Sequence, residues 1–215
     1  GRFYGRSVFT IERDGVSVDM IRAWFGQVAH KYDMDWDIFD TSKPMKVMIL
    51  VSKFDHCLND LLYRYRIGAL PMEVTAIVSN HPDAKPLADG AGIPWHHIPV
   101  TKDTKAEAEE KLFALVEETG TDLVVLARYM QVLSNDLCTR LGGRAINIHH
   151  SFLPGFKGAK PYHQAFERGV KLIGATAHFV TPDLDEGPII EQEVQRVDHT
   201  IMPDEMVAVG RDVEA

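Results

Sequence analysis

The sequence of 215 residues has few cysteines and no long apolar run. No stretch approaches the roughly 18 consecutive apolar residues of a membrane-spanning helix, and the first ten residues lack the apolar core of a signal peptide. The two cysteines, Cys57 and Cys138, lie far apart in segments of helical pattern, so we expect buried thiols rather than a disulfide. These absences predict a soluble, cytoplasmic protein.

Positive charge is also scarce. The chain has 23 lysines and arginines against 31 acidic residues, which gives a formal net charge of −8. Acids and bases are interleaved, so no basic stripe is present that could follow a phosphate backbone. We therefore expect a small-molecule ligand and neither a nucleic-acid nor a membrane partner.

Two common cofactor signatures are missing. No Gly-x-Gly-x-x-Gly motif follows a predicted strand, which argues against a dinucleotide cofactor. Four of the ten histidines invite a metal site, yet they lack a cysteine pair or a His-Glu-x-x-His spacing; they are His149, His150, His163 and His178. The sequence predicts a protein without metal or cofactor, and zinc chemistry remains the minor alternative.

Hydrophobic patterning divides the chain into two parts. In residues 1–40, alternating patterns at 7–12 and 33–38 predict two half-exposed strands on either side of a helix. Nearly continuous apolar runs then predict strands buried on both faces, at residues 46–52, 73–79, 122–127 and 145–148. Helical patterns such as 104–118 and 134–141 separate these runs. The alternation predicts an α/β fold with a doubly wound, mostly parallel sheet.

Polar residues gather where ligands bind in such sheets, beyond the carboxyl ends of the strands. Strand alternation places Asn147 and His149 on one face, and the loop 182–188 offers three carboxylates. A carboxamide can donate to a developing oxyanion, an imidazole can share that charge or move a proton, and a carboxylate can hold a water molecule. Taken singly, such residues are usually caps or turn residues. Together they suit acyl transfer.

Two motifs resemble those of the formyltransferase-fold enzymes. INIHHSFLPGFKG and HFVTPDLDEGP match an Asn-x-His strand-loop and a Leu-Asp-x-Gly-Pro loop, which puts the family's catalytic residues on Asn147, His149 and Asp185. Within that fold, SKFDHCLNDLLYR, VSNHPD, LARYMQVLS and GAKPYHQA resemble the formyltetrahydrofolate deformylases. The resemblance implies hydrolysis of 10-formyltetrahydrofolate to formate and tetrahydrofolate, which supplies formate for purine synthesis and balances the folate pool.

The resemblance also implies a set of substrate-binding residues. The loop 127–133 is expected to wrap the pterin, and a glycine-rich loop to hold the glutamate tail. His150 either helps to distinguish water from an amine or only caps its loop. The expected substrate-binding residues are Met130, Gln131, Val132, Leu133, His150, Lys157, Gly158, Thr181 and Asp183. Core packing and a solvated loop are the alternatives for several of them.

The main alternative is a folate-dependent formyltransferase to an amine acceptor, of the glycinamide ribonucleotide type. Those transferases carry a Gly-Ser-Asn type loop after the first strand, whose backbone N–H groups cradle the acceptor's phosphate. Here residues 52–57 are Ser-Lys-Phe-Asp-His-Cys, without glycine. We therefore expect water as the nucleophile. A ligand-sensing module with an inactive larger domain is a third alternative, which the presence of all three expected catalytic residues disfavours.

Residues 1–40 resemble the second half of an ACT domain, the regulatory module that precedes the catalytic domain in this family. The predicted organisation is therefore a partial ACT-like domain at 1–40 and a formyltransferase-fold catalytic domain at 41–215. The family resemblance implies a homo-oligomer, either a dimer or a tetramer. It leaves open whether the ACT-like part binds methionine or glycine.

Overall fold

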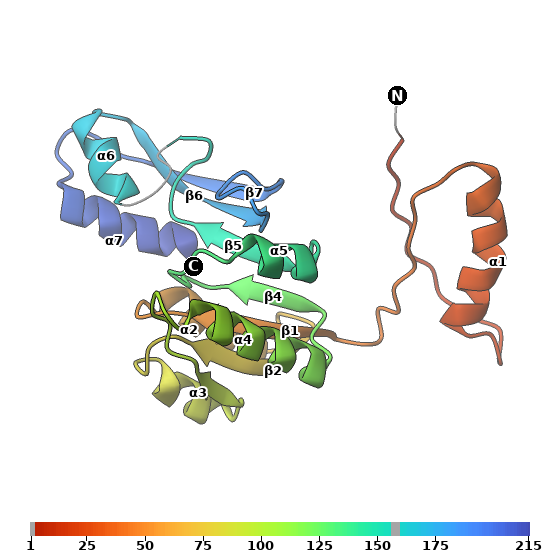
Figure 1. The fold of residues 1–215 in the computed structure, drawn as a ribbon. Coiled ribbons are helices and arrows are strands. Elements are labelled where there is room, and N and C mark those ends of the chain that lie inside the picture. Colours follow the sequence, from red (N-terminus) through yellow and green to blue (C-terminus); the bar gives the residue numbers. More distant parts are fainter. Residues whose placement is uncertain (1–2, 156–159) are drawn as a thin grey trace. The chain divides into compact units, whose positions relative to one another are not determined.

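The computed structural model of the chain describes residues 3–155 and 160–215. It divides into two compact units, Gly1–Pro44 and Met45–Ala215 (Figure 1). The sequence predicted a boundary after residue 40, whereas the structure divides the chain after Pro44. None of the described helices is long and apolar enough to cross a membrane.

From residue 3 to residue 44, the first unit contains one regular element, the helix α1 (Val18–Lys31). Its N-cap is Ser17, whose hydroxyl accepts from the backbone N–H of Met20 at 3.2 Å. The strands predicted at 7–12 and 33–38 are wrong, because neither segment pairs with another strand. Apolar side chains there remain exposed, and an isolated strand pair is marginal without a further layer. The ACT-like assignment stays a prediction.

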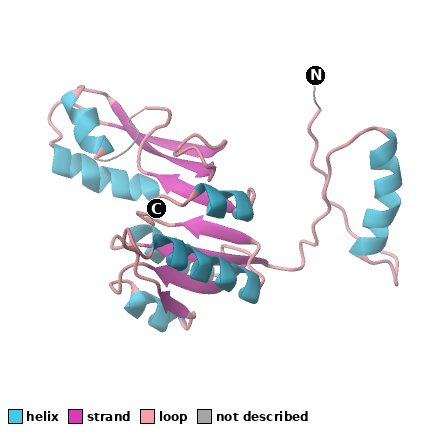
Figure 2. Ribbon diagram, in the orientation of Figure 1, coloured by secondary structure: helices cyan, strands magenta, loops and turns pink. Residues whose placement is uncertain are grey.

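The second unit is built on one seven-stranded sheet, with the order β3-β2-β1-β4-β5-β6-β7 among the described residues (Figure 2). Strands β1 to β5 pair in parallel, and β6 and β7 pair antiparallel at one edge. The predicted doubly wound, mostly parallel sheet is confirmed. The strands are β1 (Met45–Val51), β2 (Met72–Ser79), β3 (Trp95–His97), β4 (Leu123–Leu126), β5 (Ala145–His149), β6 (Leu172–Phe179) and β7 (Ile189–Arg196).

Helices cover both faces of this sheet. Helices α4 and α5 bury Leu112 and Leu137 against one face, while α2 and α3 bury Leu58 and Ala88 against the other. A smaller cluster joins α6, α7 and β6. The helices are α2 (His56–Arg66), α3 (Lys85–Ala91), α4 (Lys105–Thr119), α5 (Asn135–Leu141), α6 (Pro161–Glu167) and α7 (Pro203–Glu214).

The order of the strands reverses between β1 and β4. The chain leaves β1 for β2 and β3 on one side, and then crosses to build β4 and β5 on the other. Loops at the carboxyl ends of two such neighbouring strands diverge, and this switch point is where doubly wound sheets bind their ligands. The polar residues at the ends of β4 and β5 therefore lie at the edge of the sheet where chemistry is expected.

Candidate active site

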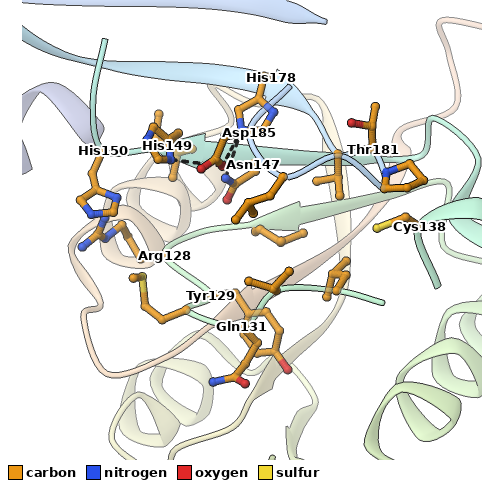
Figure 3. A pocket seen from close by; sticks show the side chains of 18 residues that line it. Arg128, Tyr129, Gln131, Cys138, Asn147, His149, His150, His178, Thr181 and Asp185 are labelled. Atoms are coloured by element: carbon orange, nitrogen blue, oxygen red, sulfur yellow. Dashed lines mark hydrogen bonds and ion pairs between the residues drawn. The ribbon is translucent and has the colours of Figure 1, made fainter. Parts of the chain in front are cut away.

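A cavity of about 190 Å³ opens between the loop after β4, the end of β5 and the loop after β6 (Figure 3). Asn147, His149 and Asp185 all line it. The structure thus brings together the three residues that the sequence nominated from two separate motifs. Its remaining wall is largely apolar and includes Leu126, Met130, Val132, Leu133, Val180 and Leu184.

His149 and Asp185 form a buried pair in this cavity. His149 Nδ1 lies 3.3 Å from Asp185 Oδ1, and the two side chains are 6% and 7% exposed. A carboxylate only accepts, so Nδ1 carries the proton. The other ring nitrogen, Nε2, is buried without a hydrogen-bond partner among the described residues. A buried, unsatisfied imidazole nitrogen at a cavity wall is well placed to meet a substrate atom.

Asp185 stays ionised in this setting. Burial by itself raises the pKa of the carboxyl, but the hydrogen bond and charge of His149 outweigh it, and the pKa falls below the ordinary value of 3.8. Asp185 also adopts a left-handed backbone conformation, with φ of 57°, which is uncommon for a residue other than glycine.

His178 is a site residue that the sequence analysis did not assign to catalysis. It lies on β6 directly opposite Asn147 on β5. Its Nε2 is 3.2 Å from Asn147 Nδ2, and its Nδ1 is 2.9 Å from the carbonyl oxygen of Phe179. Because that carbonyl can only accept, Nδ1 carries the proton and Nε2 accepts one N–H of the Asn147 carboxamide. The second N–H of Asn147 remains for a ligand.

Most of the expected substrate-binding residues also line the cavity. They are Met130, Gln131, Val132, Leu133, His150 and Thr181. Asp183 does not: its side chain is exposed, and its backbone carbonyl accepts from the Thr181 hydroxyl at 3.0 Å. The expected positions Lys157 and Gly158 lie outside the described residues. Neither the catalytic nor the binding roles are tested by this geometry alone, and they stay predictions.

His150 follows His149 and forms one end of the cavity wall. The two rings have centroids 5.3 Å apart, and the His150 ring lies 6.3 Å from that of Tyr162. Burial, and after it the positive charge of Arg128, lowers the pKa of His150 to about 4. His150 is therefore neutral at physiological pH and offers a ring nitrogen rather than a charge.

One group of possible metal ligands exists in the described residues, and it lies outside the cavity wall. His56, Cys57 and Glu214 place one ligand atom each within 4.8 Å of one another. Burial raises the pKa of Cys57 to about 12, so the thiol is protonated, and the Arg128 guanidinium lies 3.3 Å from Glu214. The Arg128 guanidinium already pairs with the Glu214 carboxylate, so these residues do not fit a metal centre.

Comparison with known proteins matches the second unit to a family. The formyl transferase model matches residues 45–215. The chain is 56% identical over 214 residues to formyltetrahydrofolate deformylase of Corynebacterium sp. (strain P-1), covering 100% of this chain and 75% of that protein. It is 46% identical to formyltetrahydrofolate deformylase of Bacillus subtilis, again over 214 residues, with 100% of this chain and 71% of that protein covered.

Solved structures give the same picture with a graded likeness. The structure of formyltetrahydrofolate deformylase from Burkholderia mallei superposes with a TM-score of 0.87 at 59% identity, covering 94% of this chain and 72% of that one. Glycinamide ribonucleotide transformylase 1 from Symbiobacterium toebii superposes with a TM-score of 0.75 at 30% identity, covering 83% and 86%. The likeness is higher to the hydrolase than to the transferase.

Proposed function

The chain belongs to the formyl transferase family, and from this premise we propose that it hydrolyses 10-formyltetrahydrofolate to formate and tetrahydrofolate. The observation that carries the proposal is the convergence of Asn147, His149 and Asp185 in one largely apolar cavity. Relatives at 46–56% identity bear the name formyltetrahydrofolate deformylase. The amine-transferring relatives share only about 30% of their residues with the chain.

Asn147 binds the formyl oxygen. One N–H of its carboxamide is directed to His178, which fixes the rotation of the amide and leaves the other N–H for the substrate. When water adds to the formyl carbon, that oxygen becomes negative, and a preorganised donor stabilises the charge. Removal of one such donor typically lowers kcat about 10²- to 10³-fold.

The His149–Asp185 pair moves the proton. Asp185 holds His149, which lines the cavity, through Nδ1, and Nε2 has no hydrogen-bond partner within the described part of the chain. Water forms a bond to the formyl carbon and gives one proton to the pair, the bond between carbon and folate nitrogen breaks, and the pair returns the proton to that nitrogen. The formic acid produced ionises to formate and releases the second proton.

The loop after β4 receives the pterin. Met130, Val132 and Leu133 give the cavity an apolar wall, and Gln131 adds an amide beside it. A flat heteroaromatic ring suits such a wall, since apolar pockets with a few polar groups are typical of small-molecule sites. Folate is the expected small-molecule partner. A cytoplasmic location, a role in supplying formate for purine synthesis and assembly into a dimer or tetramer complete the proposal.

The test is a turnover assay without an acceptor. Chelator-treated protein is incubated with 10-formyltetrahydrofolate alone, and formate and tetrahydrofolate are measured. We expect equal amounts of formate and tetrahydrofolate, because each hydrolysis releases one of each. Turnover should proceed without added metal or amine, because neither enters the mechanism above. A protein that binds folate but releases no formate until an amine is supplied would instead be a formyltransferase, the alternative that the fold also allows.

A further inference from the structure

A second cluster of buried polar groups lies beside the cavity and takes no part in the chemistry above. Its centre is Glu214 of α7, whose side chain is 1% exposed. The Tyr162 hydroxyl donates to Glu214 Oε1 at 2.7 Å, His56 Nε2 lies 2.9 Å from Oε2, and Arg128 Nε lies 3.3 Å from Oε2. We call His56, Arg128, Tyr162 and Glu214 the switch-point cluster.

The cluster stands where a second substrate is expected to bind. His56 begins α2 directly after β1, and Arg128 follows β4, so the two residues flank the point at which the strand order reverses. The loops that usually diverge there are joined instead. The Ser52 N–H donates to the Arg128 carbonyl at 3.2 Å, and the Met130 N–H donates to the Ser52 hydroxyl at 2.9 Å. Protein thus fills the customary ligand position of a doubly wound sheet.

Arg128 occupies this place at an energetic cost. Its backbone has φ of 63°, in the left-handed region that side chains with a Cβ rarely adopt. Its side chain is 10% exposed, and Nε and Nη1 lack a hydrogen bond among the described residues. The contact of Nε with Glu214 is close, but it is an ion pair without hydrogen-bond geometry. Strain and unsatisfied donors kept together at a site are typical of a functional constraint.

The cluster reaches the reaction centre through His150. Figure 3 shows the Arg128 side chain next to the His150 ring at one end of the cavity. The His150 ring in turn lies between those of His149 and Tyr162. An amine acceptor must bring its nitrogen to the formyl carbon and place the rest of its atoms beyond it. On the His150 side of His149, the next side chains are those of Arg128 and Tyr162.

We propose that the Arg128–Glu214 pair is a specificity determinant that excludes an amine-bearing second substrate and leaves water as the acceptor of the formyl group. The inference rests on the proposed hydrolysis and deepens it. Water needs no space beyond the formyl carbon, whereas a primary amine with a substituent does. Opening the cluster should let an amine compete: its nitrogen forms the new bond to the formyl carbon, and its proton goes to the departing folate nitrogen.

The experiment measures how the formyl group partitions between water and an added amine. 10-Formyltetrahydrofolate carrying ¹³C in the formyl group is turned over with glycinamide present, and labelled formate and N-formylglycinamide are quantified by NMR. The test variant is Arg128→Ala combined with Glu214→Gln, so that no buried carboxylate is left without its cation. The matched control is Arg64→Ala with Asp60→Asn, which removes an ion pair on α2 whose arginine is exposed.

From the native protein and the control we expect formate with no more than a trace of N-formylglycinamide. The double variant should raise the ratio of formylated amide to formate roughly tenfold or more over the native protein, the change that a free-energy difference of about 1.4 kcal/mol produces. A double variant that still releases formate with an unchanged ratio overturns the proposal. Absence of formate from the native protein, in contrast, overturns the proposed hydrolysis itself.

A binding measurement covers a double variant that folds but does not turn over. Saturation-transfer NMR follows glycinamide in the presence of bound tetrahydrofolate, for the native protein and for both variants. We expect a signal from the double variant only. If glycinamide binds equally to all three proteins, or to none of them, then the Arg128–Glu214 pair does not exclude it.

Discussion

At the scale of single residues, the site depends on which nitrogen of each imidazole carries the proton. Asp185 accepts from His149 Nδ1, and the Phe179 carbonyl accepts from His178 Nδ1. In both rings the protein binds Nδ1, which leaves Nε2 unprotonated and able to accept a hydrogen bond. His178 accepts from Asn147 through Nε2, while Nε2 of His149 has no hydrogen-bond partner among the described residues and is available to the substrate.

Replacement of Asp185 by asparagine should remove most of the turnover. The asparagine amide cannot share a proton with His149 as the carboxylate does, and His149 loses the anion that holds its Nδ1. We therefore expect kcat to fall by about 10²-fold or more. Folate affinity should change little, because the apolar wall is untouched. Kinetics and folate titration check this. The control is Asp103→Asn, an exposed aspartate that does not line the cavity; an equal loss in both variants would contradict the assignment.

His178→Ala tests whether this residue positions Asn147. Without the acceptor at Nε2, the carboxamide is free to rotate, and a misplaced donor should lower kcat on the order of 10- to 100-fold while KM stays nearly constant. His178→Gln keeps an acceptor oxygen and should recover part of the rate. If the alanine variant has the native kcat, or if glutamine brings no recovery, His178 is a packing residue only.

The sequence could nominate Asn147, His149 and Asp185 because each lies in a short motif with its own chemistry. It could not nominate His178, since the role of this residue arises from the register in which β5 and β6 pair. Arg128 escaped notice for a similar reason. Its partner Glu214 comes from a helix at a different place in the chain, and a pattern in one segment carries no information on such a contact.

At the scale of elements, buried strands are the most predictable feature of this chain. Continuous apolar runs located β1, β2, β4 and β5 to within a residue or two, because a strand covered on both faces needs apolar side chains at nearly every position. The alternating segments in residues 1–40 were misjudged. Alternation of apolar and polar residues indicates which side chains could face a core. It does not show that a neighbouring strand is present to pair with, which a strand requires.

The loop after β6 packs so closely that Gly187 tolerates no side chain. A Cβ at this position would lie 1.7 Å from the Phe179 carbonyl oxygen, the same atom that accepts from His178. Gly187→Ala must therefore displace the loop that carries Asp185, the end of β6, or both. The close fit links the backbone of the loop to the imidazole that orients Asn147.

We expect Gly187→Ala to lower stability by about 1–3 kcal/mol, the usual cost of overpacking, and to reduce kcat at the same time. Gly90→Ala is the matched control, since a Cβ at this helical position meets nothing within 4 Å. Urea unfolding and turnover assays measure both effects. Native turnover in Gly187→Ala would show that the loop adjusts without moving Asp185.

At the scale of the whole molecule, Glu214 ties together elements that lie far apart in the sequence, namely α2, the loop after β4 and α6. Burial raises the pKa of its carboxyl, but the hydrogen bond from His56 and the charge of Arg128 outweigh it, so the pKa lies below the ordinary 4.5. A depressed pKa in the folded state means that the carboxylate contributes stability above the unfolded-state value. That contribution is lost as the pH falls through the folded-state value.

The native protein should therefore lose stability as the pH is lowered below 4.5, and Glu214→Gln should show a shallower loss. Urea midpoints from neutral to acidic pH measure the two slopes. Glu107→Gln is the control, because the Glu107 carboxylate pairs with Lys111 on the surface and exposed pairs contribute little. Parallel slopes for the native protein and Glu214→Gln would show that the cluster does not determine how stability falls at acidic pH.

The long reach of the switch-point cluster bears on how the protein folds. His56 and Glu214 are 158 positions apart in the chain, so their contact is among the most non-local in the molecule. Contacts of this kind carry a large loop-closure entropy and tend to form late. During synthesis the sheet around β1 and β4 can assemble before α7 has been made. A nascent chain would then hold its formyl-binding residues before the Arg128–Glu214 pair that excludes amines has formed. Selectivity for water over amines would be the last property that folding confers.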